Sequence, residues 1–234
     1  MSLMLKFLVT EEFFYWYTFY MKLEIPFYSS FAVPGHPLGV HCVETSLRMI
    51  LGYFEPSESY NIEDLEKISG KQPGKGSWSF RWSLWFVEHG YEVKHYTIFD
   101  FNAFIKSGVD YIRQEYGDDV ANFQEQTSDV EGARKLAKDY VAKINIVHKK
   151  PTIDDIRSEM SRGFVVKPMV NSMVLNDKEG YEGHSVVVLD IDDSHIRFHD
   201  PGLPAFKDRR MRHARFQEAM DSFGGEMDAI RQHK

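Results

Sequence analysis

The spacing of apolar residues predicts helices in the first part of the chain. Over residues 42–53, apolar residues recur at helical spacing, which predicts a helix with one buried face. Asn61 is a suitable N-cap for a second helix over 62–69. Ser77 is a suitable N-cap for a third helix, which carries a stripe of tryptophan and phenylalanine. We therefore expect three helices before the first long strand.

The pattern changes in the second part of the chain, where runs rich in valine and isoleucine predict strands. The expected strands are 164–170, 185–191 and 195–199, preceded by 91–98 and by a short strand at 23–28. Residues 216–231 are expected to form one or two short helices, broken at Gly224 and Gly225. Helices followed by an antiparallel sheet are typical of the α+β class rather than of alternating β/α units.

The middle of the chain, 100–150, is more polar and mostly helical in pattern, which predicts a helical insertion or lid subdomain. Residues 21–234 would then form a single domain with this insertion, because 234 residues with 43% hydrophobic content suit one large globular domain. Residues 1–20 are rich in aromatic side chains and do not resemble a signal peptide, so we expect an N-terminal appendage. Such a segment would pack on the body of the protein or on a partner chain, which makes a homo-oligomer one expectation.

The charge and the single cysteine narrow the classes of function. The formal net charge is −7, whereas nucleic acids and anionic membranes are usually bound by a basic face, so neither partner is expected. The densest basic run, 207–215, is interpreted as a solvated face. No segment reaches the length of a transmembrane helix. One cysteine excludes a disulfide within the chain and favours a reducing compartment, so we expect a cytoplasmic location.

Cys42 is the candidate nucleophile because of its place in the sequence. It lies at the first turn of its expected helix, after a loop that contains glycine and proline. The first amides of a helix lack internal partners, and the helix dipole places partial positive charge there. Both effects favour the thiolate, which is the nucleophilic form of cysteine. The alternative is an inert cysteine at a buried helix end, so partner residues must decide.

His184 and Asp200 are the candidate partners of Cys42. His184 lies at the start of a strongly apolar strand, and Asp200 ends the following strand. If Asp190 pairs with Ser194 across the hairpin, His184 and Asp200 lie opposite each other, with their Cβ atoms about 5 Å apart. A carboxylate at that distance would orient the imidazole as the base of a thiolate hydrolase. A structural histidine and a simple Asp-Pro-Gly turn are the alternatives.

These segments together resemble the C39-like branch of the papain-like cysteine peptidases. The resemblance is carried by 42–51 (CVETSLRMIL), 183–188 (GHSVVV) and 199–202 (HDPG). The opening 23–28 (LEIPFY) also resembles the first strand of that family. The likeness runs from about residue 21 to residue 202, and its middle, 100–150, matches poorly.

Two positions near the cysteine depart from the family pattern. The family usually has a glycine directly after the cysteine, where this chain has Val43. It also usually has a glutamine six residues before the cysteine as an oxyanion donor, where this chain has His36. An imidazole N–H can donate to an oxyanion, so His36 is the oxyanion candidate, with a loop histidine of no role as the alternative.

The resemblance implies a papain-like fold and a cysteine-dependent peptidase that cleaves a peptide or amide bond. Its catalytic residues would be Cys42, His184 and Asp200, its substrate a peptide or protein, and it would need no metal or other cofactor. One alternative is an acyltransferase on the same fold, and another is a catalytically impaired peptide-binding module. A third alternative is a metal site built from His36, His41, Cys42 and His184.

Overall fold

The computed structural model describes residues 22–30, 41–202 and 204–233. The aromatic segment 1–20 and His36 lie outside the described residues, so the expectations for them stay predictions. The helices are α1 (Cys42–Phe54), α2 (Ile62–Ser69), α3 (Ser79–Glu88), α4 (Phe101–Ser107), α5 (Val109–Tyr116), α6 (Asp118–Thr127), α7 (Val130–Lys143), α8 (Ile153–Ser161), α9 (Ser172–Leu175) and α10 (His213–Phe223). The strands are β1 (Tyr91–Thr97), β2 (Asn145–His148), β3 (Val165–Asn171), β4 (Gly183–Ser185), β5 (Val187–Ile191), β6 (His195–Asp200), β7 (Phe206–Arg212) and β8 (Met227–Gln232).

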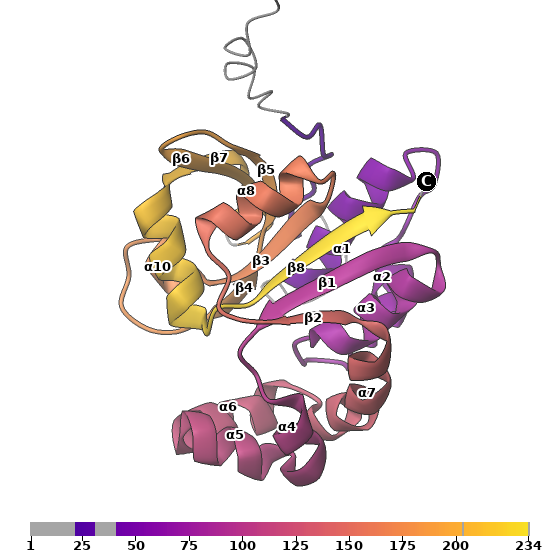
Figure 1. Ribbon diagram of the computed structural model, residues 1–234, viewed down its shortest axis with the longest axis vertical. Helices are drawn as coiled ribbons and strands as arrows, with labels where there is room; N and C mark the ends of the chain where they lie inside the picture. The colour runs from indigo at the N-terminus through magenta and orange to yellow at the C-terminus, as the bar shows by residue number, and fades with distance from the viewer. Residues whose placement is uncertain (1–21, 31–40, 203, 234) are drawn as a thin grey trace, which may run out of the picture.

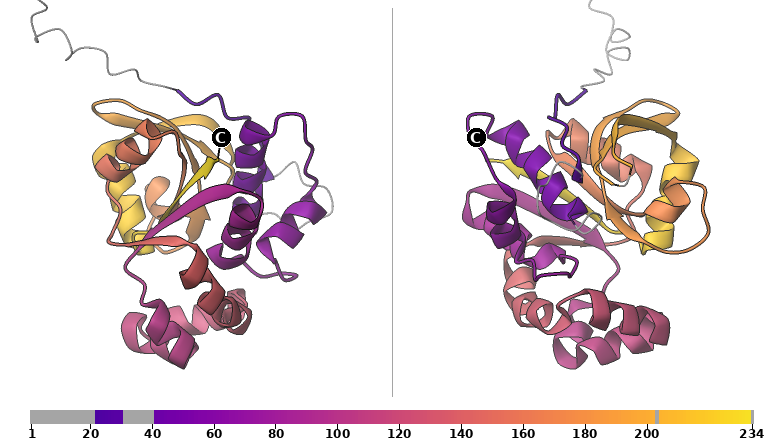
Figure 2. Two further views of the ribbon diagram at one scale, coloured as in Figure 1. Left: turned by 45° about the vertical axis from the view of Figure 1, so that its right-hand side comes forward. Right: turned by 180° about the vertical axis from the view of Figure 1, so that it is seen from behind.

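Two sheets organise the described residues. The larger sheet has the order β2-β1-β8-β3-β4, in which only the β1–β2 pair is parallel. The smaller sheet has the order β5-β6-β7 and is antiparallel. Figure 2 shows α1, α2 and α3 on one side of the larger sheet, and the smaller sheet with α8 and α10 on the other. The predicted α+β class is confirmed.

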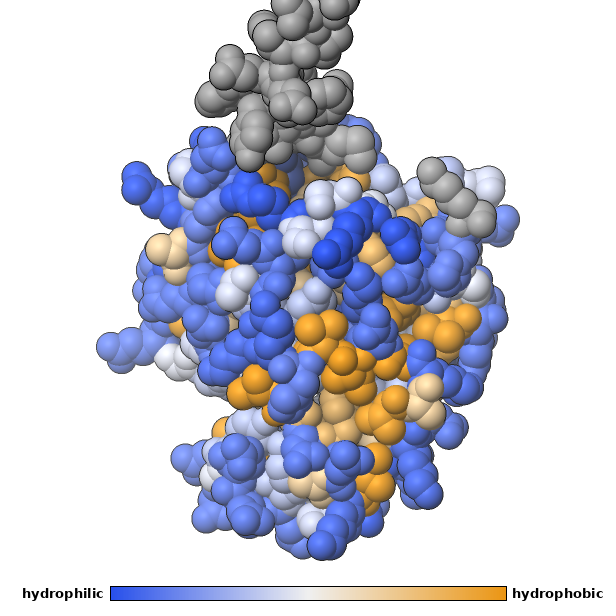
Figure 3. Space-filling model, in the orientation of Figure 1, coloured by the Kyte–Doolittle hydropathy of each residue, from blue (hydrophilic) through white to orange (hydrophobic). Residues whose placement is uncertain are grey.

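The hydrophobic core is divided between the two sides of the larger sheet. One cluster joins α1 and α3 to β1 and the helices α4 and α7, and it includes the fully buried Leu47, Phe86 and Tyr140. The second cluster joins β3 to the smaller sheet and to α10, and it includes the fully buried Phe198 and Phe216. The helices α4–α7 form a lobe at one end of the molecule (Figure 1). In Figure 3, apolar surface gathers between this lobe and the sheet, whereas polar side chains cover most of the rest of that face.

The first three predicted helices are present, with one change at a cap. Asn61 caps α2 as predicted, and its side chain accepts a hydrogen bond from the backbone of Asp64 in a capping box. The third helix begins at Ser79, and its N-cap residue is Trp78 rather than Ser77. The hydroxyl of Ser77 donates instead to Glu44 Oε1 of α1, at 2.6 Å. Ser77 therefore joins two helices instead of capping one.

Two secondary-structure predictions are wrong. Residues 23–28 form no strand, although the Leu23 amide donates one hydrogen bond to the Leu189 carbonyl, at 2.8 Å. The C-terminal segment forms helix α10 and then strand β8, which lies between β1 and β3 in the larger sheet. Both faces of β8 are buried, so its sequence lacks the alternation that marks a half-exposed strand. No helix among the described residues is both long and apolar enough to cross a membrane.

The central position of β8 predicts a large effect of truncating its core side chain. Ile230 is fully buried, so Ile230→Ala should lower the free energy of unfolding by about 2–5 kcal/mol. Gln232→Ala, at the exposed end of the same strand, should change it by less than about 0.5 kcal/mol. Urea denaturation of both variants checks this prediction. Equal denaturation midpoints for the two variants would contradict the central, buried position of β8 in the sheet.

Candidate active site

Cys42 is the first residue of α1, and its side chain lies at the edge of a cavity. The helix behind it is anchored by fully buried apolar residues, among them Leu47, Ile50 and Leu51. The side chain of the N-cap residue His41 makes no capping hydrogen bond and instead contacts Glu66 Oε1 through Nε2, at 2.9 Å. Cys42 is half-buried, so the thiol is held on a rigid helix tip and still reaches the cavity.

His184 is buried on β4, directly opposite Val170 of β3. The neighbouring residue, Ser185, ties this strand to α1, because its hydroxyl donates to Ser46 Oγ at 3.0 Å. Ser46 lies one helical turn after Cys42, and both serines are fully buried. This contact fixes the helix tip against the strand, so Cys42 and His184 meet and form a side-chain hydrogen bond.

Asp200 completes a row of three side chains. His184 Nε2 and Asp200 Oδ1 are 2.7 Å apart, and both residues are buried. The second carboxylate oxygen of Asp200 accepts a hydrogen bond from Arg209 Nη1 at 2.8 Å. The Gly202 amide donates to Oδ1 at 3.0 Å. The structure therefore brings together all three residues that the sequence singles out.

The hairpin register that the sequence predicts is wrong, although the contact between the side chains is present. Val187 pairs with His199 and Ile191 pairs with Ile196, with a bulge between them. His184 belongs to β4, in the larger sheet, whereas Asp200 ends β6 in the smaller sheet. The chain changes sheets at Val186, whose amide donates to the Pro168 carbonyl at 3.3 Å. The two side chains therefore meet across a junction between sheets and not within one ladder.

Charge and burial favour an ionised Cys42–His184 pair. Burial alone would raise the pKa of the Cys42 thiol, but the hydrogen bond and charge of His184, with the Ser185 backbone, outweigh it and lower that pKa. Burial would also lower the pKa of His184, but hydrogen bonds to Asp200 and Cys42 and their charges raise it to about 10. Asp200 has a pKa below its usual value, because bonds from His184, Gly202 and Arg209 outweigh its burial.

Gly202 leaves the space in which the His184–Asp200 pair lies. A Cβ atom at this position would lie 2.8 Å from His184 Cε1 and 2.9 Å from Asp200 Oδ1. Real Cβ atoms do not approach other heavy atoms so closely, so a larger residue would push the imidazole or the carboxylate out of place. The Asp-Pro-Gly segment is thus part of the site and not only a turn.

Arg209 is the residue of the site that sequence reasoning missed. It lies in the basic run 207–215, interpreted above as a solvated face, but its guanidinium contacts Asp200 and the Leu175 carbonyl. Its neighbour Asp208 forms an ion pair with Arg197 across the sheet. Residues 207–212 of the run lie in strand β7 and 213–215 begin α10; from 209 to 212, half-buried and exposed side chains alternate. Alternation within the run could have separated Arg209 from its exposed neighbours.

The two departures from the family pattern have different outcomes. Val43 is buried and packs in the hydrophobic core beside the cavity. His36 lies outside the described residues, so its role as an oxyanion donor stays a prediction. Across 22–30, 41–202 and 204–233, no group of three or more histidine, cysteine, aspartate or glutamate side chains could hold a metal ion.

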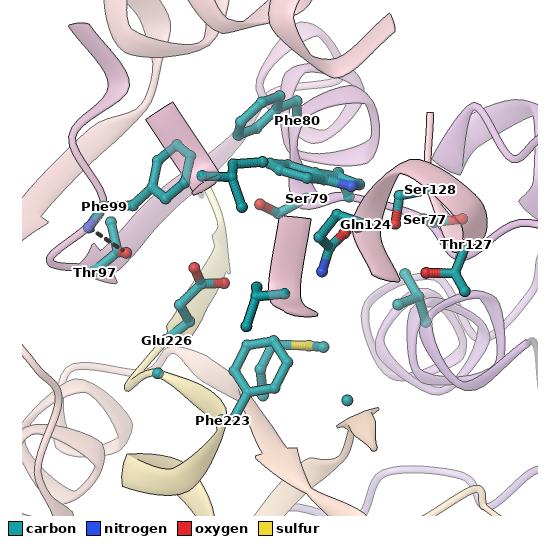
Figure 4. Close-up of a pocket in the computed structure, with 18 of the residues that line it drawn as sticks. Ser77, Ser79, Phe80, Thr97, Phe99, Gln124, Thr127, Ser128, Phe223 and Glu226 are labelled. Atoms are coloured by element: carbon teal, nitrogen blue, oxygen red, sulfur yellow. Dashed lines mark hydrogen bonds between the residues drawn. The ribbon is translucent and has the colours of Figure 1, made fainter. Parts of the chain in front are cut away.

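A cavity of about 460 Å³ opens beside Cys42. Its walls come from α3, from the helices α5 and α6 of the lobe, from β1 and β3, and from the turn between α10 and β8. Figure 4 shows the rings of Phe80, Phe99 and Phe223 around it, with the polar ends of Gln124 and Glu226 pointing into it. The lobe helices therefore form one wall of the space in front of the candidate nucleophile.

Comparisons with known proteins give a likeness in structure only. No protein-family model matches the chain, and no curated protein matches it. A crystal structure from Bacillus anthracis, described as a C39-like peptidase, matches at 14% identity with a TM-score of 0.46, covering 92% of this chain and 98% of that one. The peptidase domain of Streptococcus ComA, a bifunctional ABC transporter of a quorum-sensing pathway, matches at 14% identity with a TM-score of 0.43, covering 83% and 93%.

At such identities and TM-scores the likeness carries no weight for activity. Any function proposed for this chain therefore rests on the geometry of its own site.

The contact with Asp200 predicts how the reactivity of Cys42 responds to substitution. In Asp200→Asn the imidazole loses its charged partner, so the pKa of His184 should fall, the pKa of Cys42 should rise, and alkylation by iodoacetamide near pH 7 should slow by about tenfold or more. Asp190→Asn, on the neighbouring strand, is the matched control and should alkylate at the wild-type rate, because Asp190 Oδ1 accepts a hydrogen bond from the next amide, that of Ile191, and not from the residues of the site. Equal rates in the two variants would contradict the link between Asp200 and the thiol.

Proposed function

We propose that this protein is a cysteine-dependent hydrolase, a C39-like peptidase that cleaves a peptide or amide bond. Cys42 is its nucleophile, His184 its general base and acid, and Asp200 the residue that orients His184. The observation that carries the proposal is the position of His184, which contacts a thiol and a carboxylate at once. Because Nε2 contacts Asp200, the other ring nitrogen, Nδ1, is left for the sulfur of Cys42.

The reaction proceeds through two acyl transfers. The Cys42 thiolate attacks the carbonyl carbon, and the C–N bond breaks as the His184 imidazolium gives its proton to the leaving amine. The neutral imidazole then takes a proton from water, which attacks the thioester and releases the acid and the thiolate. Asp200 accepts the hydrogen bond of the imidazole throughout, so the ring keeps the orientation that both transfers require.

The oxyanion of each intermediate needs hydrogen-bond donors near the thiol. The backbone amide of Cys42 is the first donor that we assign, because Cys42 is the first residue of α1 and early helix amides have no partner inside the helix. His36 is the second donor that we propose from the sequence. With two donors the carbonyl is polarised where negative charge develops.

The alternatives differ from this proposal in what they predict. A binding module that had lost its chemistry would separate Cys42 from His184 or cover the thiol, whereas here the two side chains are in contact beside a cavity. An acyltransferase would use the same three residues and pass the acyl group to an amine or thiol in place of water.

Activity-based labelling tests the proposal directly. A peptidyl acyloxymethyl ketone should label the wild-type protein at Cys42, and a peptide pool should yield products whose formation falls by about 10³-fold in Cys42→Ser and in His184→Ala. His148→Ala, an exposed histidine on β2, is the matched control and should retain wild-type rates.

The products separate the outcomes of this experiment. Carboxylic acid as the main product, even with amines or thiols added, supports a hydrolase. Products carried mainly on the added amine or thiol would indicate an acyltransferase. Cleavage that persists in Cys42→Ser would overturn the proposal.

A further inference from the structure

The cavity beside Cys42 carries more carboxylates than basic groups. Among the described residues that line it, three are acidic, namely Glu182, Glu226 and Asp228, and two are basic, namely His95 and Lys167. Both basic groups are bound to Asp228, with His95 Nδ1 at 2.7 Å and Lys167 Nζ at 3.3 Å. When all three carboxylates are ionised, one negative charge remains in excess even with His95 protonated.

Glu226 is the carboxylate best placed to meet a ligand. Its side chain points into the cavity (Figure 4). In the part of the chain that the structure describes, no basic side chain lies within ion-pair distance of it. Burial raises the pKa of Glu226, the charge of Asp228 raises it further, and the charges of His95 and Lys167 lower it only in part; a cation that entered the cavity would lower that pKa further.

The strand pairing sets the distance from Glu226 to the candidate nucleophile. The Met169 amide donates to the Glu226 carbonyl at 3.0 Å, and Met169 pairs with Ser185, whose backbone contacts the Cys42 thiol. Neighbouring strands are about 4.8 Å apart, so Glu226 lies about 10 Å from Ser185. A lysine or arginine side chain extends about 6–7 Å from its Cα. The charged nitrogen of its head group bonds a carboxylate oxygen at about 3 Å. The side chain and this bond together therefore match the separation of about 10 Å between Glu226 and Ser185.

We propose that this cavity receives the basic side chain of a lysine or arginine residue within two residues of the scissile bond, with Glu226 as its carboxylate partner. This inference rests on the proposed function, because it assigns the specificity of the same site. The aromatic walls contribute as well, since the faces of Trp78, Phe80 and Phe99 attract a cation and cover its aliphatic stem.

An apolar side chain fits this cavity less well than a basic one. Leucine or phenylalanine would cover the aromatic walls but would add no positive charge for Glu226 beyond those of His95 and Lys167, which are shared with Asp228. An acidic side chain would add a second uncompensated carboxylate beside Glu226. Charge complementarity therefore selects a cation.

Matched peptides that differ at one position test the inference. The peptides are varied at one position at a time, taking in turn the two positions before and the two positions after the scissile bond. The varied residue is lysine, norleucine or glutamate. At one of these positions, kcat/KM of the wild-type protein for the lysine peptide should be at least tenfold higher than for the norleucine peptide. The ratio of kcat/KM for the lysine peptide to that for the glutamate peptide should be larger still. In Glu226→Gln the ratio of lysine to norleucine should fall by about tenfold, whereas Glu179→Gln, outside the cavity lining, should keep it.

A binding experiment separates this inference from the proposed function. In Cys42→Ala, which lacks the nucleophile, calorimetry should show tighter binding of the lysine peptide than of the norleucine peptide, and this preference should disappear in Cys42→Ala with Glu226→Gln. If no peptide is hydrolysed but the preference in binding is found, the proposed function fails and the cavity assignment stands. Equal binding of both peptides, or a preference that Glu226→Gln leaves intact, would overturn the assignment.

Discussion

The candidate site depends on one buried hydrogen bond, between His184 Nε2 and Asp200 Oδ1. In surroundings that exclude water, a charged imidazole is unfavourable unless a carboxylate compensates it, and Asp200 provides that compensation at 2.7 Å. The charge of the imidazole in turn stabilises the Cys42 thiolate, against the burial that would keep the thiol neutral. The Gly202 amide donates to the same carboxylate oxygen as His184, and Arg209 donates to the other oxygen, so the carboxylate is held in place. The reactivity proposed for Cys42 is therefore supported by contacts on β6, β7 and the turn between them.

The fold makes this bond by passing one short segment between two sheets. Residues 183–191 leave the larger sheet at Val186 and enter the smaller one, so His184 and Asp200 approach each other across the junction. The Ser46–Ser185 contact fixes α1 at the same junction and brings Cys42 to the imidazole. On the far side of the cavity, the row from Ser185 through Met169 to Glu226 carries the carboxylate that we assign to substrate recognition.

The sequence predicted what local patterns determine and missed what depends on distant partners. The helix of Cys42 and the cap at Asn61 follow from apolar spacing and local hydrogen bonding, and the structure contains both. Strand β8 was missed because a central strand buried on both faces has no alternation, and because its Asp228 is paired with His95 and Lys167 rather than exposed. Arg209 was hidden within a run of basic residues, and the hairpin register depended on a bulge and a change of sheet that the sequence of the hairpin does not mark.

The ionisation of Cys42 is the most direct test of this account. The ultraviolet absorbance of the thiolate, measured against pH in the wild type with Cys42→Ser subtracted, gives the pKa of this one sulfur. In the wild type we predict a thiolate that persists at pH values well below the ordinary pKa of a cysteine thiol, because the raised pKa of His184 keeps the imidazolium beside it. In His184→Ala the imidazolium is absent, so the pKa of Cys42 should rise and the thiolate should be lost at these pH values. A pKa at or above the ordinary value in the wild type, unchanged in His184→Ala, would contradict the ion pair and with it the proposed mechanism.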